Sequence, residues 1–301
     1  MRVAAIDCGT NSIRLLIADV ADGEITDVVR RMEIVRLGEG VDRTGRLSDE
    51  ALARTRAALQ AYESEISGLG IKKVRMCATS ASRDASNAHE FRDMVRGVLG
   101  VDPEVITGDE EARLSFTGAV AGLDADPPFL IFDIGGGSTE FVTGVDGVEH
   151  AISTDIGCVR MTERHLHSDP PSAAEIAATE TDITDAVDAA LAAVPGREAR
   201  TLVGLAGTVT TITALAQGLP GYDASRIHHA RVSREAVAKV ADELLAMTTA
   251  ERLALPVMHP GRADVIVGGA LILKIVMERS GHESLIASEH DILDGIAFSI
   301  A

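Results

Sequence analysis

The chain has 301 residues, of which 46% are hydrophobic and 25% are charged, so it has the composition of a folded protein with about two domains. Its 46 acidic and 28 basic residues give a formal charge of -18, which argues against general binding of nucleic acids or of anionic membranes. It has no tryptophan and few other aromatic residues, so surfaces that stack nucleic-acid bases are not expected.

The three cysteines, Cys8, Cys77 and Cys158, are odd in number and lack CxxC spacing. We therefore expect small buried thiols, not disulfides or zinc ligands. The chain begins at once with a strand-like run, and its apolar stretches are shorter than the ~20 residues that span a bilayer. A cytoplasmic setting without a signal peptide is the expectation.

A strand, a polar turn with glycine and a second strand are predicted for residues 3–20 and again for residues 129–146. At an offset of 126 residues, the two segments share aspartate, glycine and serine at matching places: Asp7 with Asp133, Gly9 with Gly135, and Ser12 with Ser138. This internal repeat predicts two similar lobes, related by an approximate dyad, whose two turns face one cleft.

Helix and strand patterns alternate along the rest of the chain, as is typical of α/β proteins. Residues 48–68 predict a helix that begins at Ser48 and carries an apolar stripe. The other elements predicted before the second hairpin are a strand at 73–79, a helix at 87–99, a short strand at 104–107 and a helix at 110–121. After that hairpin they are a helix at 172–193, a strand at 201–208 that runs into a glycine turn, and helices at 233–247, 262–279 and 291–300.

Residues 123–129 contain two aspartates and two prolines, and they mark the expected boundary between the lobes. The predicted domains are an N-terminal lobe at 1–124 and a C-terminal lobe at 125–301. The last helix could also pack back on the first lobe.

The first candidate site is the turn at residues 7–12, DCGTNS. Its glycine lets the backbone approach an anion, and Thr10, Asn11 and Ser12 add hydroxyl and amide donors. The Asp7 carboxylate repels phosphate, so beside phosphate it would hold a hydrated divalent cation. The alternative is an ordinary Asx turn.

The second candidate site is the turn at residues 133–140, DIGGGSTE. Asp133 is the counterpart of Asp7 on the side of the metal, and Glu140 either assists it or is a solvated strand residue. Successive glycines suit a loop whose amides surround an oxyanion. The residues expected to do so are Gly135, Gly136, Gly137 and Ser138.

A third turn, at residues 206–211, follows an apolar strand and opens a predicted helix. Gly207 and Thr208 could therefore bind an anion at the start of the helix, although a plain helix cap is the alternative. Arg83, just after the strand at 73–79, is well placed for phosphate because its planar guanidinium matches phosphate oxygens.

A fourth turn, GDEEAR at residues 108–113, places carboxylates at a helix start, where capping is their usual role. A phosphate hydrolase also needs a base that orients water, and only carboxylates lie in a suitable turn. The histidines carry no recognisable motif and are expected to be surface or core residues: His165, His167, His228 and His229.

These turns and the segments around them resemble the exopolyphosphatase/guanosine pentaphosphate phosphatase family of the actin-like superfamily, which includes sugar kinases. The matching segments run in order along the chain: DCGTNSIRLLI at 7–17, RLGEGVD at 36–42, ATSASRDASN at 78–87, GDEEARL at 108–114, FDIGGGSTEF at 132–141, IGCVRMTE at 156–163, GLAGTVTT at 204–211, RADVIVGGALIL at 262–273 and SEHDILDGI at 288–296.

The resemblance implies two ribonuclease-H-like lobes with the active site in the cleft between them. It also implies that water attacks the terminal phosphorus of a phosphoanhydride with the help of a divalent cation, Mg²⁺ or in its place Mn²⁺. By position, Glu111 matches the catalytic base, Asp7 and Asp133 match the carboxylates near the metal, and Arg83 matches a phosphate-contacting arginine. The phosphate-holding loops match Thr10 to Ser12, Gly135 to Ser138, and Gly207 with Thr208.

The expected function is an exopolyphosphatase that releases orthophosphate from inorganic polyphosphate. The chain ends near residue 301, without the helical domains of long family members, so short polyphosphates are the expected substrates. The final motif reads DILDGI where many members carry a basic version, so one anion contact is expected to be missing. A homodimer is expected from the family.

Three alternatives remain open. The first is a guanosine pentaphosphate phosphatase, which uses the same anion pocket. The second is a catalytically weak regulator that binds nucleotides or alarmones such as guanosine tetraphosphate. The third is an actin-like sugar or acetate kinase, which would transfer the phosphate to an acceptor.

Overall fold

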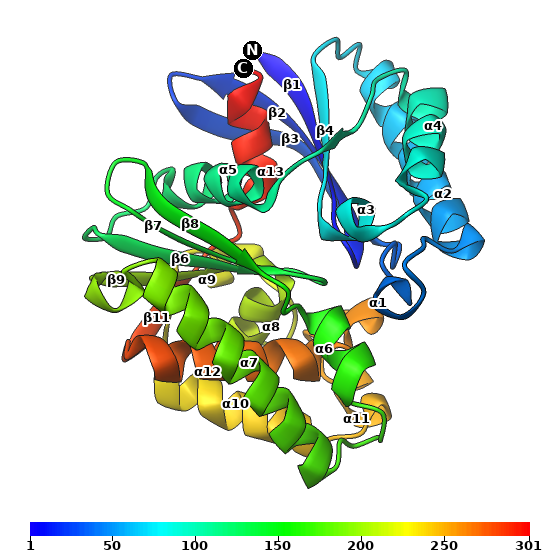
Figure 1. Cartoon of the computed structure of the whole chain (residues 1–301). Helices are drawn as coiled ribbons and strands as arrows, with labels where there is room; N and C mark the ends of the chain where they lie inside the picture. The colour runs from blue at the N-terminus through cyan, green and yellow to red at the C-terminus, as the bar shows by residue number, and fades with distance from the viewer. The chain divides into compact units, whose positions relative to one another are not determined.

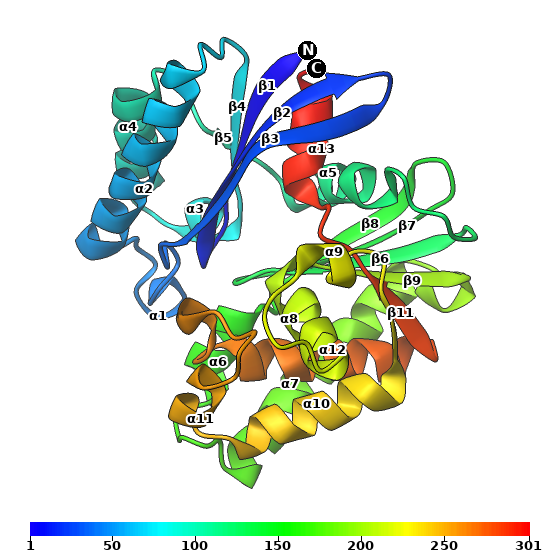
Figure 2. The same cartoon turned by 180° about the vertical axis from the view of Figure 1, so that it is seen from behind.

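The chain folds into two units of α/β structure, each built on its own mixed sheet (Figures 1 and 2). This computed structural model describes residues 1–301. Unit 1 consists of Met1–Gly122 together with His290–Ala301, and unit 2 consists of Leu123–Glu289. Unit 1 is therefore discontinuous in sequence, because the chain returns to it for its last twelve residues.

The sheet of unit 1 has the strand order β3-β2-β1-β4-β5. The first three strands form an antiparallel meander: β1 (Arg2–Cys8), β2 (Ser12–Ala21) and β3 (Glu24–Ile34). The other two strands run parallel to β1: β4 (Val74–Ala78) and β5 (Glu104–Val105).

Helices cover both faces of this sheet. One face packs on α2 (Asp49–Gly68) and α4 (Ala88–Leu99), and the other packs on α5 (Gly108–Val120) and α13 (Ile292–Ser299). Successive strand residues point to opposite faces, so Ile6 belongs to the first core and its neighbour Ala5 to the second. Two short helices complete the unit: α1 (Val41–Thr44) and α3 (Ser80–Asp84).

The sheet of unit 2 has the order β10-β11-β9-β6-β7-β8. Its antiparallel meander is β6 (Phe129–Ile134), β7 (Thr139–Gly144) and β8 (Val148–Thr154). Parallel to β6 run β9 (Thr201–Leu205) and β11 (Ser284–Ala287), and β10 (Arg231–Ser233) is an antiparallel edge strand.

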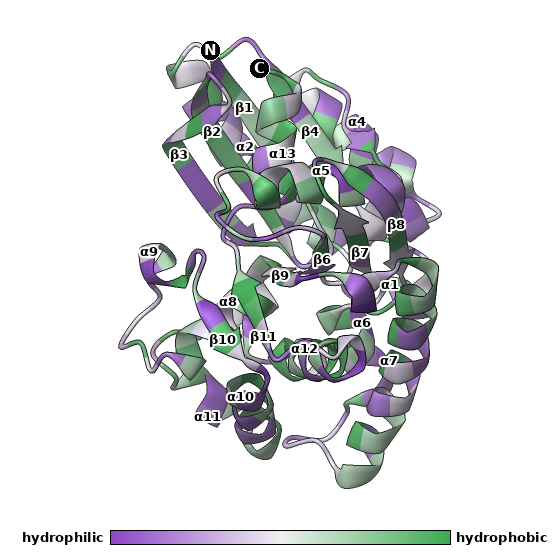
Figure 3. Cartoon of the chain, turned by 90° about the vertical axis from the view of Figure 1, so that its left-hand side faces the viewer, coloured by the Kyte–Doolittle hydropathy of each residue, from purple (hydrophilic) through white to green (hydrophobic).

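The helices of unit 2 share one apolar core with its sheet. They are α6 (Cys158–His165), α7 (Ala173–Ala193), α8 (Ala206–Ala216), α9 (Ala224–Ile227), α10 (Arg234–Ala246) and α12 (Ile266–Ser280). The short helix α11 (Thr249–Leu253) adds no residue to this core. Figure 3 shows hydrophilic and hydrophobic bands along α7, as expected of a helix with one buried face. Short 3₁₀ turns lie at Gly196–Glu198 and Pro260–Arg262.

Both sheets place a meander of three strands beside parallel strands, with the first strand of the meander in the middle. This is the strand order of a ribonuclease-H-like fold, so the predicted fold class is confirmed. The repeat also keeps its register: Asp7 lies opposite Arg14 in the first hairpin, and Asp133 lies opposite Glu140 in the second.

Several boundaries differ from the sequence-based expectation. The helix α5 begins at Gly108 and not at 110, because the Thr107 side chain caps it by accepting a hydrogen bond from the Glu110 amide. The helix predicted at 262–279 begins only at Ile266, after the 3₁₀ turn. The third strands of the meanders, β3 and β8, were not predicted.

The cysteines are free and buried, as predicted. Burial raises the pKa of the Cys158 thiol to about 11, and it also raises the pKa values of Cys8 and Cys77. These thiols are therefore poor nucleophiles at neutral pH. None of the helices combines the length and the apolar character needed to cross a membrane.

The helices α5 and α13 cross at two glycines with no room for a side chain. A Cβ atom on Gly295 would lie 2.0 Å from the Leu114 carbonyl oxygen, and one on Gly118 would lie 1.9 Å from the Asp291 carbonyl oxygen. Both neighbouring atoms belong to the backbone, so a whole helix would have to shift to make room. The position of α5 is thus fixed by α13.

We expect Gly295→Ala to lower stability by about 1–3 kcal/mol, because the added methyl group forces the two helices apart. The control is Gly97→Ala in α4, where an added Cβ has no neighbour within 4 Å. That substitution should stabilise the helix by about 0.5–1 kcal/mol. Thermal unfolding followed by circular dichroism measures both changes, and equal melting temperatures for the two variants would contradict this packing.

Candidate active site

Polar turns follow all three parallel strands of unit 1 at the same edge of the sheet. The β1–β2 turn follows Cys8, α3 follows β4, and α5 follows β5. Because β1, β4 and β5 are parallel neighbours, their carboxyl ends meet at this edge, which is where ligands bind in open α/β sheets. The predicted site residues of this unit come from these three segments.

The first turn is closed by a hydrogen bond from the Gly9 amide to the Ser12 carbonyl, 2.9 Å. The segment that follows β3 donates backbone hydrogen bonds to this turn. The Asn11 carbonyl accepts hydrogen bonds from the amides of Val35 and Arg36, and the Thr10 carbonyl accepts one from Gly38. The carbonyls of the turn are used in this way, and the Thr10 hydroxyl forms a hydrogen bond with the Ser80 hydroxyl at 2.9 Å.

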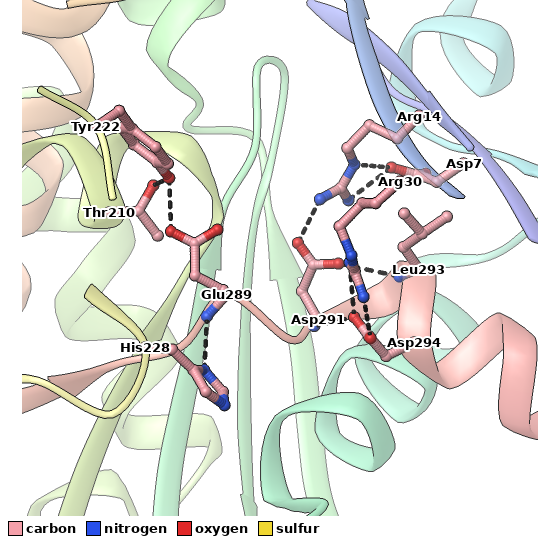
Figure 4. A network of polar contacts seen from close by, with 10 residues as sticks. All are labelled: Asp7, Arg14, Arg30, Thr210, Tyr222, His228, Glu289, Asp291, Leu293 and Asp294. Carbon is pink, nitrogen blue, oxygen red and sulfur yellow. Dashed lines mark hydrogen bonds and ion pairs between the residues drawn. The ribbon is translucent and has the colours of Figure 1, made fainter. Parts of the chain in front are cut away.

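Asp7 is the one acidic residue of β1, and its carboxylate is buried. Arg14, directly opposite on β2, donates from Nε (3.0 Å) and from Nη2 (2.7 Å), and both hydrogen bonds go to Oδ2 (Figure 4). Burial raises the pKa of Asp7, and the positive charge of Arg14 opposes this shift. Arg14 is thus committed to an ion pair.

Three buried side-chain atoms near this edge have no hydrogen-bond partner: Asp7 Oδ1, Asn11 Oδ1 and Ser82 Oγ. An unpartnered buried polar atom costs about 1–3 kcal/mol, so native proteins seldom retain one without a reason. All three are oxygens, and those of Asp7 and Asn11 can accept a hydrogen bond but cannot donate one. A cation or a hydrogen-bond donor would supply the missing partner of these two atoms.

Glu111 lies in the first turn of α5 and is buried, whereas the adjacent Glu110 side chain is 42% exposed and pairs with Arg75. The Glu111 carboxylate contacts Arg83 at 3.4 Å, and Arg83 also donates to the Ile106 carbonyl at 3.1 Å. The structure therefore brings the predicted base and the predicted phosphate-binding arginine together, in contact with each other.

The second turn repeats the first, with a hydrogen bond from the Gly135 amide to the Ser138 carbonyl at 3.0 Å. The start of α6 holds this turn, since the Gly136 carbonyl accepts hydrogen bonds from the amides of Val159 and Arg160. Gly157 permits the contact, because a Cβ atom there would lie 2.3 Å from the Gly136 carbonyl oxygen. As in unit 1, the carbonyls face the supporting segment.

Asp133 and Glu140 are paired across β6 and β7, and both are buried. The Ser153 hydroxyl of β8 donates to Glu140 Oε1 at 2.7 Å. Glu140 is therefore not a solvated strand residue, and this alternative is wrong. Unlike the Asp7–Arg14 pair, this pair places two acids opposite each other.

The third turn lies at the same edge of its sheet as Asp133, because β9 is parallel to β6 and Leu205 is paired with Asp133. No separate glycine turn follows β9. The chain turns sharply at Ala206, with φ of 67°, and Gly207 already belongs to α8. Thr208 is buried next to it.

Arg262 is a residue of this site that the motifs did not single out. A Cβ atom on Gly207 would lie 2.1 Å from its Nη2 atom, and its Nη1 atom donates to the Thr211 hydroxyl at 3.0 Å. The glycine is thus needed so that the guanidinium can lie against the start of α8. Arg262 belongs to the matching segment at 262–273, but its own role could not be deduced from that segment.

The histidines that the sequence left without a role lie in unit 2. His165 pairs with Asp182 at 2.8 Å, and the rings of His228 and His229 stack with centroids 3.7 Å apart. Neither unit groups three or more His, Cys, Asp or Glu side chains that could hold a metal ion. A metal here would depend on single carboxylates, water and substrate oxygens.

Comparison with known proteins gives full-length matches. The chain is 53% identical over 314 residues to "Exopolyphosphatase 2" of Mycobacterium tuberculosis, an alignment that covers 100% of this chain and 98% of the relative. The crystal structure of an exopolyphosphatase-like protein matches with 44% identity and a TM-score of 0.95, covering 99% of this chain and 98% of that one.

The crystal structure of the Aquifex aeolicus member of the Ppx/GppA family matches with 32% identity and a TM-score of 0.84, covering 99% of this chain and 97% of that one. The model of the Ppx/GppA phosphatase family matches residues 16–301. The chain therefore belongs to the Ppx/GppA phosphatase family.

Proposed function

We propose that the protein is an exopolyphosphatase that releases terminal orthophosphate from inorganic polyphosphate. The observation that carries the proposal is the buried Glu111 carboxylate at the start of α5, on the edge of the sheet that also holds the Asp7 turn. The family and the name of the relative from M. tuberculosis support polyphosphate as the substrate.

In this proposal Glu111 accepts a proton from water as that water attacks the terminal phosphorus in line with the departing chain. Arg83 orients the Glu111 carboxylate and contacts phosphate oxygens with its other donors. The hydroxyls and amides of Thr10, Asn11 and Ser12 hold further phosphate oxygens.

Unit 2 has a candidate phosphate-holding loop of its own. The amides of Gly136 and Gly137 and the Ser138 hydroxyl surround an oxyanion, whereas the Gly135 amide donates to the Ser138 carbonyl. Gly207 with Thr208 offers the start of α8 to another oxyanion. The supporting observation is that the carbonyls of Gly135 and Gly136 point toward α6, so the polar groups left to a ligand are donors.

A divalent cation, Mg²⁺ or Mn²⁺, fits the residues present, because Asp7 Oδ1 is a buried acceptor without a partner. Within unit 1 Asp7 would hold such a cation, and within unit 2 Asp133 with Glu140 are the candidate ligands. When bound, the cation supplies neutralising charge for the phosphate oxygens.

Glu111→Gln should lower kcat for phosphate release by about 10²-fold or more, because the amide cannot accept the proton of the attacking water. The matched control is Glu110→Gln, which changes an adjacent exposed glutamate and should leave kcat close to that of the wild type. Steady-state phosphate release measures both, and near-normal turnover of Glu111→Gln would remove this residue from the role of base.

A substrate panel tests the reaction itself. With Mg²⁺, we expect the fastest phosphate release from short polyphosphates, slower release from guanosine pentaphosphate and ATP, and almost none after chelation. Transfer of phosphate to a sugar or acetate would indicate a kinase. Tight binding of guanosine tetraphosphate without turnover of any substrate would indicate a regulator.

Guanosine pentaphosphate phosphatase activity is the second candidate, because the same anion-binding loops could hold the 5'-phosphates of that nucleotide. Faster release from the nucleotide than from polyphosphate of equal phosphate content would favour it. A cytoplasmic homodimer is also part of the proposal, on the basis of the family resemblance, and the mass measured by light scattering tests the dimer.

A further inference from the structure

Asp291, at the other end of the chain from Asp7, is connected to it through a single arginine. The Arg14 guanidinium donates from Nε and Nη2 to Asp7 Oδ2 and from Nη1 to Asp291 Oδ2, so it lies between the two carboxylates (Figure 4). The Asp291 side chain is only 3% exposed. All three residues lie within unit 1.

Asp291 cannot move freely, because it is the N-cap of α13. Its Oδ1 accepts a hydrogen bond from the Leu293 amide at 3.0 Å, and its own amide donates to Asp294 Oδ2 at 3.0 Å. This capping box leaves Oδ2 free to fix Arg14. The orientation of Arg14 is thus set by the backbone of α13.

The same helix fixes the position of α5 through the crossing at Gly118 and Gly295. Glu111 lies on α5, one turn before this crossing begins at Leu114. The two carboxylates assigned to the reaction, Asp7 and Glu111, are therefore both held by the last helix of the chain.

We propose that Asp291 is a positioning residue that acts through Arg14. By holding Arg14 Nη1, it keeps the other two nitrogens on Asp7 Oδ2 and so leaves Asp7 Oδ1 without a partner and available to a divalent cation. If Arg14 were released, it could rotate and cover both Asp7 oxygens, in the side-on geometry that arginine and carboxylate groups favour. This inference rests on the cation-dependent reaction proposed above.

A neighbouring residue of the same helix provides the control. Asp294 is also buried and also belongs to the capping box, but it pairs with Arg30, at 2.6 Å, and not with Arg14. Asp291→Asn and Asp294→Asn each remove one buried ion pair and keep an oxygen for capping. Only the first pair leads to Asp7.

The experiment measures cation binding in the Glu111→Gln background, so that tripolyphosphate is bound and not consumed. Mn²⁺ is titrated at a fixed concentration of tripolyphosphate, and the melting temperature is measured at each step. The readout is the Mn²⁺ concentration at which the rise in melting temperature reaches half of its maximum. Asp291→Asn should raise this concentration about 10-fold or more, on the scale of residues that orient a metal ligand. Asp294→Asn should lower the melting temperature of the free protein but leave this concentration within about 2-fold.

Arg14→Lys provides a second variant should Asp291→Asn fold poorly. Lysine keeps the positive charge but loses the three-donor geometry, so it should raise the Mn²⁺ concentration by a similar factor. Equal concentrations for Asp291→Asn and Asp294→Asn, with the Mn²⁺ dependence of the parent intact, would overturn this inference alone. A parent whose binding of tripolyphosphate does not depend on Mn²⁺ would overturn the proposed cation role and this inference with it.

Discussion

The buried carboxylate of Asp7 is the constraint around which the edge of unit 1 is arranged. Moving a charged group from water into a protein costs several kcal/mol per ion unless other groups compensate the charge. For an idealised ion in a dry interior, this desolvation energy is about 20 kcal/mol. Arg14 compensates one oxygen, and Asp291 fixes Arg14 in turn. The other oxygen, Asp7 Oδ1, has no partner, and a bound cation would supply one.

The internal repeat keeps the geometry of the two hairpins and changes their charge. In both copies an aspartate is the second-last residue of the first strand, and a glycine amide donates to a serine carbonyl across the turn. The residue that faces the aspartate on the second strand lies seven positions further along the chain. That facing position is Arg14 in one copy and Glu140 in the other. The two aspartates are therefore not equivalent: Asp7 is paired with the guanidinium of Arg14, and Asp133 lies opposite a second acid. The same hairpin thus carries an acid–base pair in unit 1 and two acids in unit 2.

Much of the fold could be predicted from the sequence, because its features are local. The capped helix at 48–68 and the repeated hairpin depend on residues close together in the chain, and both are found as predicted. The third strands β3 and β8 were missed because they alternate weakly: in β3, no residue is fully buried. The late start of α12 depends on a 3₁₀ turn that helical periodicity does not reveal.

The candidate site was less predictable, because its decisive contacts are distant in sequence. Arg14, which no motif singles out, forms an ion pair with a residue 277 positions away. Asp291 lies in the motif whose missing basic residue suggested only a lost anion contact. The contact of Arg262 with Gly207 likewise joins separate segments. Motif spacing identifies the residue types, and only the packing of α13 and α12 shows which of them meet.

Asp7 Oδ1 has no hydrogen-bond partner in the protein, and we infer that it binds a divalent cation. The most direct measurement is anomalous diffraction from crystals of the Glu111→Gln variant soaked with Mn²⁺ and tripolyphosphate. We expect an anomalous peak about 2.1 Å from Asp7 Oδ1, with phosphate oxygens as further ligands. A Mn²⁺ peak whose ligands do not include Asp7, with Oδ1 bonded to a protein donor, would contradict it.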